Sequence, residues 1–468
     1  MKLLRSAAMV LLVLSTPVIP SELSLYQVSY HQLDNGMGVI LKQRGDSRNV
    51  SIRLGVDVGL EDFSCEKREV PHFLEHLLFT GTSKNGEYEL ERMLNDRGGF
   101  SNASTGRFRT TYETDIHSDY VMYAVGYLYE IMTDSLISEE DVEKSRNIIF
   151  RERGGERSEL IEFLHEKGLK KSAYSKLAGY INMGCDTLTS PKGVTREDIM
   201  RALESFYVPN NMVISIVGMF SEEKVLKTLN STFGQLYRVE VDHSTRRTAN
   251  LKVDGPREFV GSLSPILATD ATVDILYMVP NRRSSEKYPL QLLESYLQDR
   301  IFKKVRIDNG LGYSPDVSFM PLDDIGLFGL SGDVDFDEMK QVQELLQQEI
   351  DAISQGDIDE EIFNKTKQYL SLSYDQGYEL NASYADYYVS RHYELQNFGI
   401  LTNESEAIER VMLAQFSNIA QKYLRPENQL IARDYPTLSY HQLFVGIGVL
   451  ILIAMIIMAR YLMRRRRI

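Results

Sequence analysis

The stretch of the chain that decides its fold and chemistry is His72-Phe73-Leu74-Glu75-His76. On a helix, His72 and His76 lie one turn apart on one face, so both imidazoles can point at one site, and Glu75 borders that site. Two histidines plus a carboxylate, with a fourth position left for water, form the ligand set of a catalytic zinc. The order is the inverse of the commoner His-Glu-x-x-His. We therefore expect one Zn2+ per chain, with His72 and His76 among its ligands.

The motif needs a third protein ligand, and the helical pattern at 138–153 offers two carboxylates, Glu143 and Glu152. Apolar residues surround the motif and predict a buried helix with the polar triple in a half-buried cleft. A short motif also recurs by chance on surface helices, where both histidines would stay without metal. The residues alone leave this alternative open. The flanking apolar residues are Phe73, Leu74, Leu77, Leu78 and Phe79.

From Leu33 to about Arg153, the chain resembles the insulinase, pitrilysin and mitochondrial processing peptidase family of zinc endopeptidases. In that family the third zinc ligand lies about eighty residues after the first histidine, so the resemblance implies Glu152 as a metal ligand. A looser resemblance extends over roughly residues 28–435. The matching pieces, in family order, are Leu33-x-Asn35-Gly36, His72-x-x-Glu75-His76-Leu77-x-Phe79-x-Gly81-Thr82, Gly98-Gly99, Asn102-Ala103-x-Thr105, Tyr112 and Arg151-Glu152.

The resemblance implies an α+β fold with two homologous domains, each a mostly antiparallel sheet covered by helices, together forming half of a clamshell. Internal similarity agrees, because two segments recur loosely at a shared offset of about 217–220 residues. We expect a zinc-binding peptidase domain at 28–245 and a duplicated domain at 256–435. The second copy lacks zinc ligands, since the position matching His72 falls near Leu292.

The second copy carries an arginine, a glycine-rich turn and a tyrosine, from Arg306 to Tyr313. The resemblance implies that Arg306 and Tyr313 help to hold substrate opposite the zinc and to stabilise the oxyanion. A surface ion pair and a packed aromatic ring are the plain alternatives. A chain of this length supplies one half-shell, so the resemblance also implies a homodimer, or a heterodimer with a second half-shell subunit.

Two further features concern the residues that contact substrate and the residues that support the zinc ligands. Asn102, Ala103 and Thr105 are expected either in an edge strand that pairs with an extended peptide substrate or in an ordinary turn. Seven residues before Glu152 the family usually has a glutamate that supports the zinc ligands, and here that residue is Ser145. Glu143 lies nearby as a substitute. Loss of such a partner weakens metal binding by roughly 10–100-fold.

Both ends of the chain are predicted to interact with a lipid bilayer. Residues 1–20 have the basic-then-apolar layout of a secretory signal, without a clear cleavage site. Residues 443–463 are long and apolar enough for a transmembrane helix, and the arginine-rich tail at 464–468 predicts a cytoplasmic C-terminus. The body is therefore expected outside the cytoplasm. The periplasmic face of a bacterial inner membrane fits, although a eukaryotic single-pass protein would have a similar sequence.

The formal charge of −14 is unevenly distributed. The first 20 residues carry two cations and the last 33 carry five, without acids, so the body between them carries −21. This charge argues against a nucleic-acid partner and suits cationic or unfolded peptides. Whether Cys65 and Cys185 are joined stays open, since two cysteines in an oxidising compartment permit a bridge without requiring it.

The sequence thus predicts a membrane-anchored zinc endopeptidase that hydrolyses unfolded polypeptides or short peptides, with Glu75 activating the attacking water. The alternative is a non-catalytic or weakly active family member that acts as a membrane-anchored binding or assembly subunit of a complex.

Overall fold

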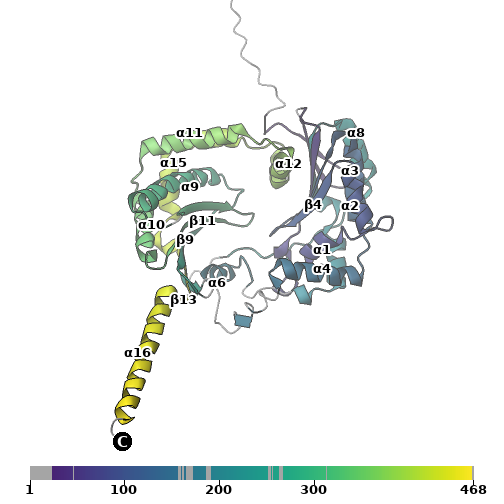
Figure 1. The fold of residues 1–468 in the computed structure, drawn as a ribbon. Coiled ribbons are helices and arrows are strands. Elements are labelled where there is room, and N and C mark those ends of the chain that lie inside the picture. Colours follow the sequence, from purple (N-terminus) through teal and green to yellow (C-terminus); the bar gives the residue numbers. More distant parts are fainter. Residues whose placement is uncertain are drawn as a thin grey trace, which may run out of the picture.

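The computed structural model describes residues 24–155 except 46, then 160, 163–164, 172–185, 191–250, 255, 257–262, 267–312 and 314–465. These residues form two lobes, each built on one sheet (Figure 1). Most helices cover the outer sides of the two lobes, and the sheets lie on the inner sides. The α+β class expected from the sequence is confirmed.

The first lobe contains a six-stranded sheet in the order β1-β2-β6-β3-β5-β4. Its pairs are antiparallel except β2 with β6. The central strand β6 is buried throughout and its neighbour β3 is buried after Asn49, although one face of β3 carries the polar residues Ser51 and Arg53, whereas β4 forms an edge. The strands are β1 (Ser29–Gln32), β2 (Gly38–Gln43), β3 (Asn49–Val56), β4 (Phe100–Thr105), β5 (Thr110–His117) and β6 (Met212–Gly218). The helices and short turns are η2 (Leu60–Asp62), η3 (Cys65–Lys67), α1 (Val70–Leu77), α2 (Glu87–Asn95), η4 (Ser118–Tyr120), α3 (Val121–Thr133), α4 (Glu139–Glu152), η5 (Pro191–Gly193), α7 (Arg196–Phe206), η6 (Pro209–Asn211), α8 (Glu222–Ser231) and η7 (Phe233–Gln235).

The second lobe contains a five-stranded sheet in the order β10-β11-β9-β12-β7, in which only β12 and β7 pair in parallel. Its strands are β7 (Glu258–Ser262), β9 (Asp270–Val279), β10 (Asp316–Pro321), β11 (Gly326–Asp335) and β12 (Gln429–Tyr435), and a separate pair joins β8 (Leu267–Ala268) to β13 (Leu438–Ser439). The helices are α9 (Lys287–Ile301), the π-helix η8 (Phe302–Asp308), α10 (Met339–Ser354), α11 (Glu360–Gln376), α13 (His392–Phe398), α14 (Glu404–Glu409), α15 (Leu413–Tyr423) and the short η9 (Pro426–Asn428).

The two halves of the chain exchange helices. α12 (Asn381–Ser390) follows the strands of the second lobe up to β11, yet it packs on β3 and β6 of the first lobe. Conversely, α6 (Ala173–Tyr180) precedes the second lobe in the sequence and packs on its strands β7 and β12. Each helix completes a separate apolar cluster with the sheet it covers. The inner face of each sheet is therefore buried by a segment from the other half of the chain.

Tyr388 tests this exchange. Its side chain is fully buried in the cluster between α12 and the first sheet, and its hydroxyl donates to the Leu25 carbonyl at 2.8 Å. We expect Tyr388→Ala to lower the free energy of unfolding by about 3–5 kcal/mol, because it leaves a large cavity at the joint. Tyr369→Ala on α11, where the ring is 65% exposed, should stay within about 0.5 kcal/mol of the parent. Denaturant unfolding of the two variants gives both values, and equal stability would contradict the exchange as a source of stability.

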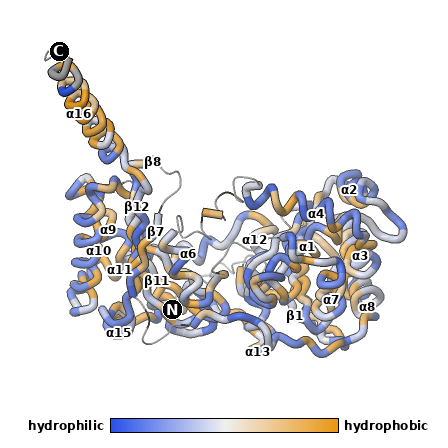
Figure 2. Tube along the Cα trace, turned by 90° about the horizontal axis from the view of Figure 1, so that it is seen from below, coloured by the Kyte–Doolittle hydropathy of each residue, from blue (hydrophilic) through white to orange (hydrophobic). Residues whose placement is uncertain are grey.

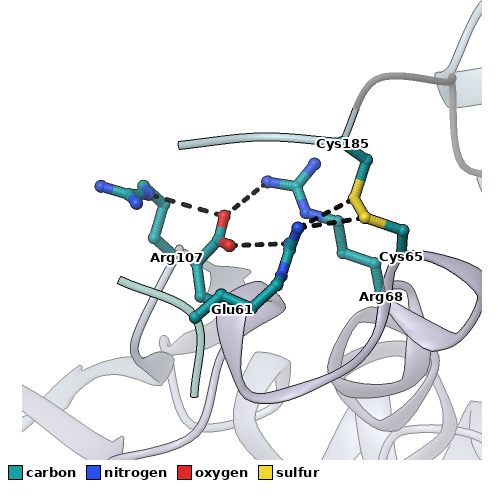
Figure 3. The surroundings of a disulfide bond; sticks show 6 residues. Glu61, Cys65, Arg68, Arg107 and Cys185 are labelled. Atoms are coloured by element: carbon teal, nitrogen blue, oxygen red, sulfur yellow. Dashed lines mark hydrogen bonds and ion pairs between the residues drawn. A yellow bond between two sulfur atoms is a disulfide. The ribbon is translucent and has the colours of Figure 1, made fainter. Parts of the chain in front are cut away.

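A disulfide joins Cys65 in η3 to Cys185, which follows α6 (Figure 3). The pairing left open by the sequence is therefore present. Arg247 donates to both sulfur atoms, at 3.0 and 3.2 Å. Next to it, the fully buried Glu61 forms ion pairs with three guanidinium groups, those of Arg68, Arg107 and Arg247. This cluster fastens the segment after α6 to the lobe that contains α1.

The helix α16 (Tyr440–Arg465) projects away from the second lobe (Figure 1) and is apolar over most of its length (Figure 2). Residues 440–460 are long and apolar enough to cross a membrane, and none of this span is buried against the body. The signal-like segment at 1–20 and the end of the basic tail lie outside the described residues.

Candidate metal centre and active site

The helix α1 presents its polar motif on one side only. Its other side is buried in the core of the first lobe, which fixes the orientation of the helix. The side chains of His72 and His76 are 22% and 20% exposed, so they lie half-buried at the surface of that core. Glu75 lies with them, close enough for the three side chains to share one ion. The core residues of α1 are Val70, Pro71, Phe73, Leu74 and Leu77.

Glu152 completes the cluster from the last residue of α4. Its Oε2 lies 3.3 Å from Nε2 of His72 and 3.5 Å from Nε2 of His76, and the two nitrogen atoms are 3.3 Å apart. Zinc in a tetrahedral site binds nitrogen and oxygen at about 2.0–2.1 Å, which places neighbouring ligand atoms about 3.3–3.4 Å apart. The triangle formed by these three atoms therefore fits a tetrahedral zinc.

Local sequence determines where α4 begins and how it meets α1. The Ser138 hydroxyl caps the N-terminus of the helix by accepting a hydrogen bond from the Asp141 amide. Acidic residues in the first turn interact favourably with the positive end of the helix dipole. Farther along, the Arg146 guanidinium lies over the ring of Phe73 in α1, 5.3 Å from its centre. The packing of α4 against α1 places Glu152, the last residue of α4, beside the histidines.

The Glu75 carboxylate is held from β4. Thr105 Oγ1 donates to Glu75 Oε2 at 2.5 Å, whereas Oε1 has no hydrogen-bond partner within the described part of the chain. Asn102, Ala103 and Thr105 all belong to β4, at the edge of the sheet, so this segment is a strand and not a turn. Asn102 is exposed, and Ala103 and Thr105 are partly buried.

Charges around the histidines act on them in opposite directions. Burial lowers the pKa of His72, but its hydrogen bond to Glu69 and the nearby charges of Glu75, Glu69 and Glu152 outweigh burial and raise it overall. Burial and then the charge of His72 lower the pKa of His76. Zinc needs both imidazoles neutral, so metal affinity should weaken as the pH falls.

The other predicted site residues lie apart from this cluster. Glu143 is 65% exposed and pairs with Arg146 at 3.1 Å. Its side chain therefore lies on the solvent side of α4, away from the histidines that it was expected to support. Ser145 is buried without a described contact to either histidine. Arg306 is exposed in η8 and donates to the Gly312 carbonyl at 2.8 Å. Tyr313 lies outside the described residues.

Sequence reasoning missed Glu69, the residue before α1. Its Oε2 lies 3.0 Å from Nδ1 of His72. The available signal was its spacing, because a residue three positions before His72 lies on the same side of the helix.

A cavity of about 470 Å³ lies where the two lobes meet, and Ser104 and Gly106, the neighbours of Thr105, line it. It therefore adjoins the strand that holds Glu75. Its wall carries both signs of charge, from Arg107, Arg109, Arg282, Glu113, Asp323 and Asp386.

Two family models match most of the chain. The sequence model described as insulinase (peptidase family M16) matches residues 38–179, and the model described as the peptidase M16 inactive domain matches residues 193–370. The first match contains the whole histidine–glutamate cluster. The second match covers the region in which the sequence has no equivalent of that cluster.

An uncharacterized zinc protease of Bacillus subtilis is 22% identical over 74% of this chain and 83% of its own length. A probable mitochondrial-processing peptidase subunit beta of Schizosaccharomyces pombe is 32% identical, and the match spans 49% of each chain. Among solved structures, a protease from Helicobacter pylori has a TM-score of 0.72 at 18% identity, covering 88% of this chain and all of that one. The last similarity shows the fold alone.

Proposed function

Because the chain belongs to the insulinase, or M16, family of peptidases, we propose that it is a membrane-anchored zinc endopeptidase acting on unfolded polypeptides or short peptides. The observation that supports this most strongly is the triangle of His72 Nε2, His76 Nε2 and Glu152 Oε2, whose sides of 3.3–3.5 Å match tetrahedral zinc. Several relatives are also named zinc proteases.

His72, His76 and Glu152 would hold the metal. When bound, zinc supplies Lewis-acid activation of water and of the scissile carbonyl. Glu75 is the proton carrier. It accepts a proton from the attacking water at Oε1 and later delivers it to the leaving amine. The hydrogen bond from Thr105 to Oε2 keeps the carboxylate in place during both transfers.

The substrate would bind as an extended strand along β4. An edge strand offers unpaired backbone groups to a peptide, and the end of β4 at Thr105 adjoins Glu75. Side chains of such a peptide alternate between the two faces of the sheet. Those on the inner face would reach the cavity lined by Ser104, where both signs of charge are available. Most backbone groups of a folded protein are already hydrogen-bonded within it, so an unfolded chain is the better substrate.

Several parts of the proposal concern the assembly. We propose that α16 spans the membrane, that the body faces the periplasm and that a second half-shell, identical or not, completes the substrate chamber. The length and apolar composition of α16 support the anchor. Arg306 and Tyr313 are proposed to face the zinc of a partner subunit, where they would hold substrate.

The alternative, a binding subunit without activity, is less well supported. The match to a domain described as inactive covers 193–370, whereas the four residues that the chemistry needs lie together in the first lobe. These residues are His72, Glu75, His76 and Glu152.

Metal removal tests the proposal. We expect the purified full chain to contain zinc, to cleave an unfolded polypeptide, to lose that activity when the zinc is chelated and to regain it when Zn2+ is restored. The same polypeptide in its folded form should be cleaved far more slowly. Activity that persists after complete removal of metal would contradict the zinc mechanism.

A further inference from the structure

The carboxylate of Glu69 bridges the two helices that carry the candidate ligands. One oxygen, Oε2, lies 3.0 Å from Nδ1 of His72, and the other, Oε1, lies 3.2 Å from Nη1 of Arg153. Arg153 directly follows Glu152, the last residue of α4. Both oxygens of Glu69 are therefore engaged, one by the imidazole on α1 and one by the end of α4.

The surroundings of Glu69 separate this arrangement from an ordinary surface contact. Glu69 is only 7% exposed, and the side chain of Arg153 is 19% exposed. Glu69 is the residue before α1, and its side chain makes no capping hydrogen bond to that helix. A buried carboxylate without such a role is stable only when paired. Here His72 and Arg153 are two of its partners.

The contact at Nδ1 determines which nitrogen of His72 is free. When Nδ1 donates its proton to Glu69, Nε2 carries the lone pair, and Nε2 is the atom in the triangle with His76 and Glu152. A carboxylate on the far nitrogen of a histidine also makes the metal-facing nitrogen more basic. Glu143, which the sequence offered as a substitute for the supporting glutamate, and Ser145, which stands at that glutamate's position, make no contact with either histidine among the described residues.

We propose that Glu69 is a positioning residue of the metal centre, which holds the His72 imidazole with Nε2 toward the metal and ties it, through Arg153, to the end of α4. The inference deepens the proposed function and rests on it. By holding His72, Glu69 controls how tightly the metal is bound and how the ligands are spaced, without touching substrate.

The central test is zinc affinity of the full chain, measured by competition with a chelator. We expect Glu69→Gln to weaken zinc binding by about tenfold and Glu69→Ala by up to about 100-fold, the range found for lost outer partners of metal ligands. Glu66→Gln is the matched control, because it removes the same charge from an exposed residue three positions earlier. Equal zinc affinity of the two Gln variants would overturn the proposal.

Two further measurements separate positioning from mere folding. Arg153→Gln should weaken zinc binding less than Glu69→Gln, and the double variant should fall short of the sum of both effects, because the residues act as one unit. The absorption spectrum of the Co2+-substituted protein should differ between Glu69→Gln and the parent, but not between Glu66→Gln and the parent. Full additivity together with unchanged cobalt spectra would contradict a positioning role.

A readout without metal distinguishes this inference from the proposed function. In zinc-free protein, at a pH where His72 is neutral, nitrogen NMR of the histidine side chains should show its proton on Nδ1, and Glu69→Ala should shift that signal. If this holds but the parent neither binds zinc nor cleaves peptides, the proposed function fails and the placement of Glu69 stands. If peptides are cleaved while the proton lies on Nε2, the inference fails and the peptidase stands.

Discussion

Replacing Glu75 with glutamine is expected to lower kcat on an unfolded polypeptide by about 10²–10⁴-fold, the range for loss of a general acid–base group. Glutamine keeps the size of the side chain and an oxygen that can accept from Thr105. It cannot accept the proton of the attacking water. Because Glu75 is not a corner of the ligand triangle, the variant should bind as much zinc as the parent.

Two controls make this experiment decisive. Zinc content measured on the same samples shows whether activity is lost through chemistry or through loss of metal. A Glu75→Gln protein that is as active as the parent would exclude Glu75 as the proton carrier. If both proteins bind zinc and neither cleaves any of a varied set of unfolded peptides, the chain is a binding subunit.

Removing the carboxylate of Glu152 should have the second large effect. We expect Glu152→Ala to weaken zinc binding by more than about 100-fold, because one of three protein ligands is lost. This is a larger loss than that expected for residues that only hydrogen-bond to a ligand. Activity at limiting zinc should fall in parallel. Chelator competition measures the affinity, and added Zn2+ should restore only part of the activity.

Glu143→Ala is the matched control on the same helix. Glu143 has the same charge and lies nine positions before Glu152, but its side chain is 65% exposed and pairs with Arg146. Zinc affinity should therefore stay within a factor of about two of the parent. A stronger effect of Glu143→Ala than of Glu152→Ala would reverse the assignment of the third ligand.

Local spacing explains which parts of the site could be predicted. One helical turn separates His72 from His76, so any helix through this motif brings the imidazoles together. Glu152 required the resemblance to a family, because nothing in the spacing of α4 distinguishes it from Glu143. Glu69 was missed because the sequence does not tell which way the side chain of a residue just before a helix points. Its spacing allows a contact with His72, and the structure shows that contact.

The exchange of helices could not be predicted for a related reason. An amphipathic pattern shows that one face of a helix is buried, but it does not identify the surface that covers it. The aromatic residues of α12 predict burial equally well against either sheet. For α6, the pairing of Cys65 with Cys185 gives no hint of the exchange, since it ties the end of that helix to the first lobe, whereas the helix itself packs on the second sheet.

This exchange also constrains how the protein is made. The last strand of the first sheet ends at Gly218, but the helix that covers its inner face ends at Ser390. At a synthesis rate of about 5–20 residues per second, the nascent first half waits roughly 10–35 s for its missing cover. During that interval an apolar surface is open to solvent. We therefore expect the emerging chain to depend on a holding chaperone, and ribosome-bound fragments that stop before residue 381 to be far more sensitive to protease than fragments that include Ser390.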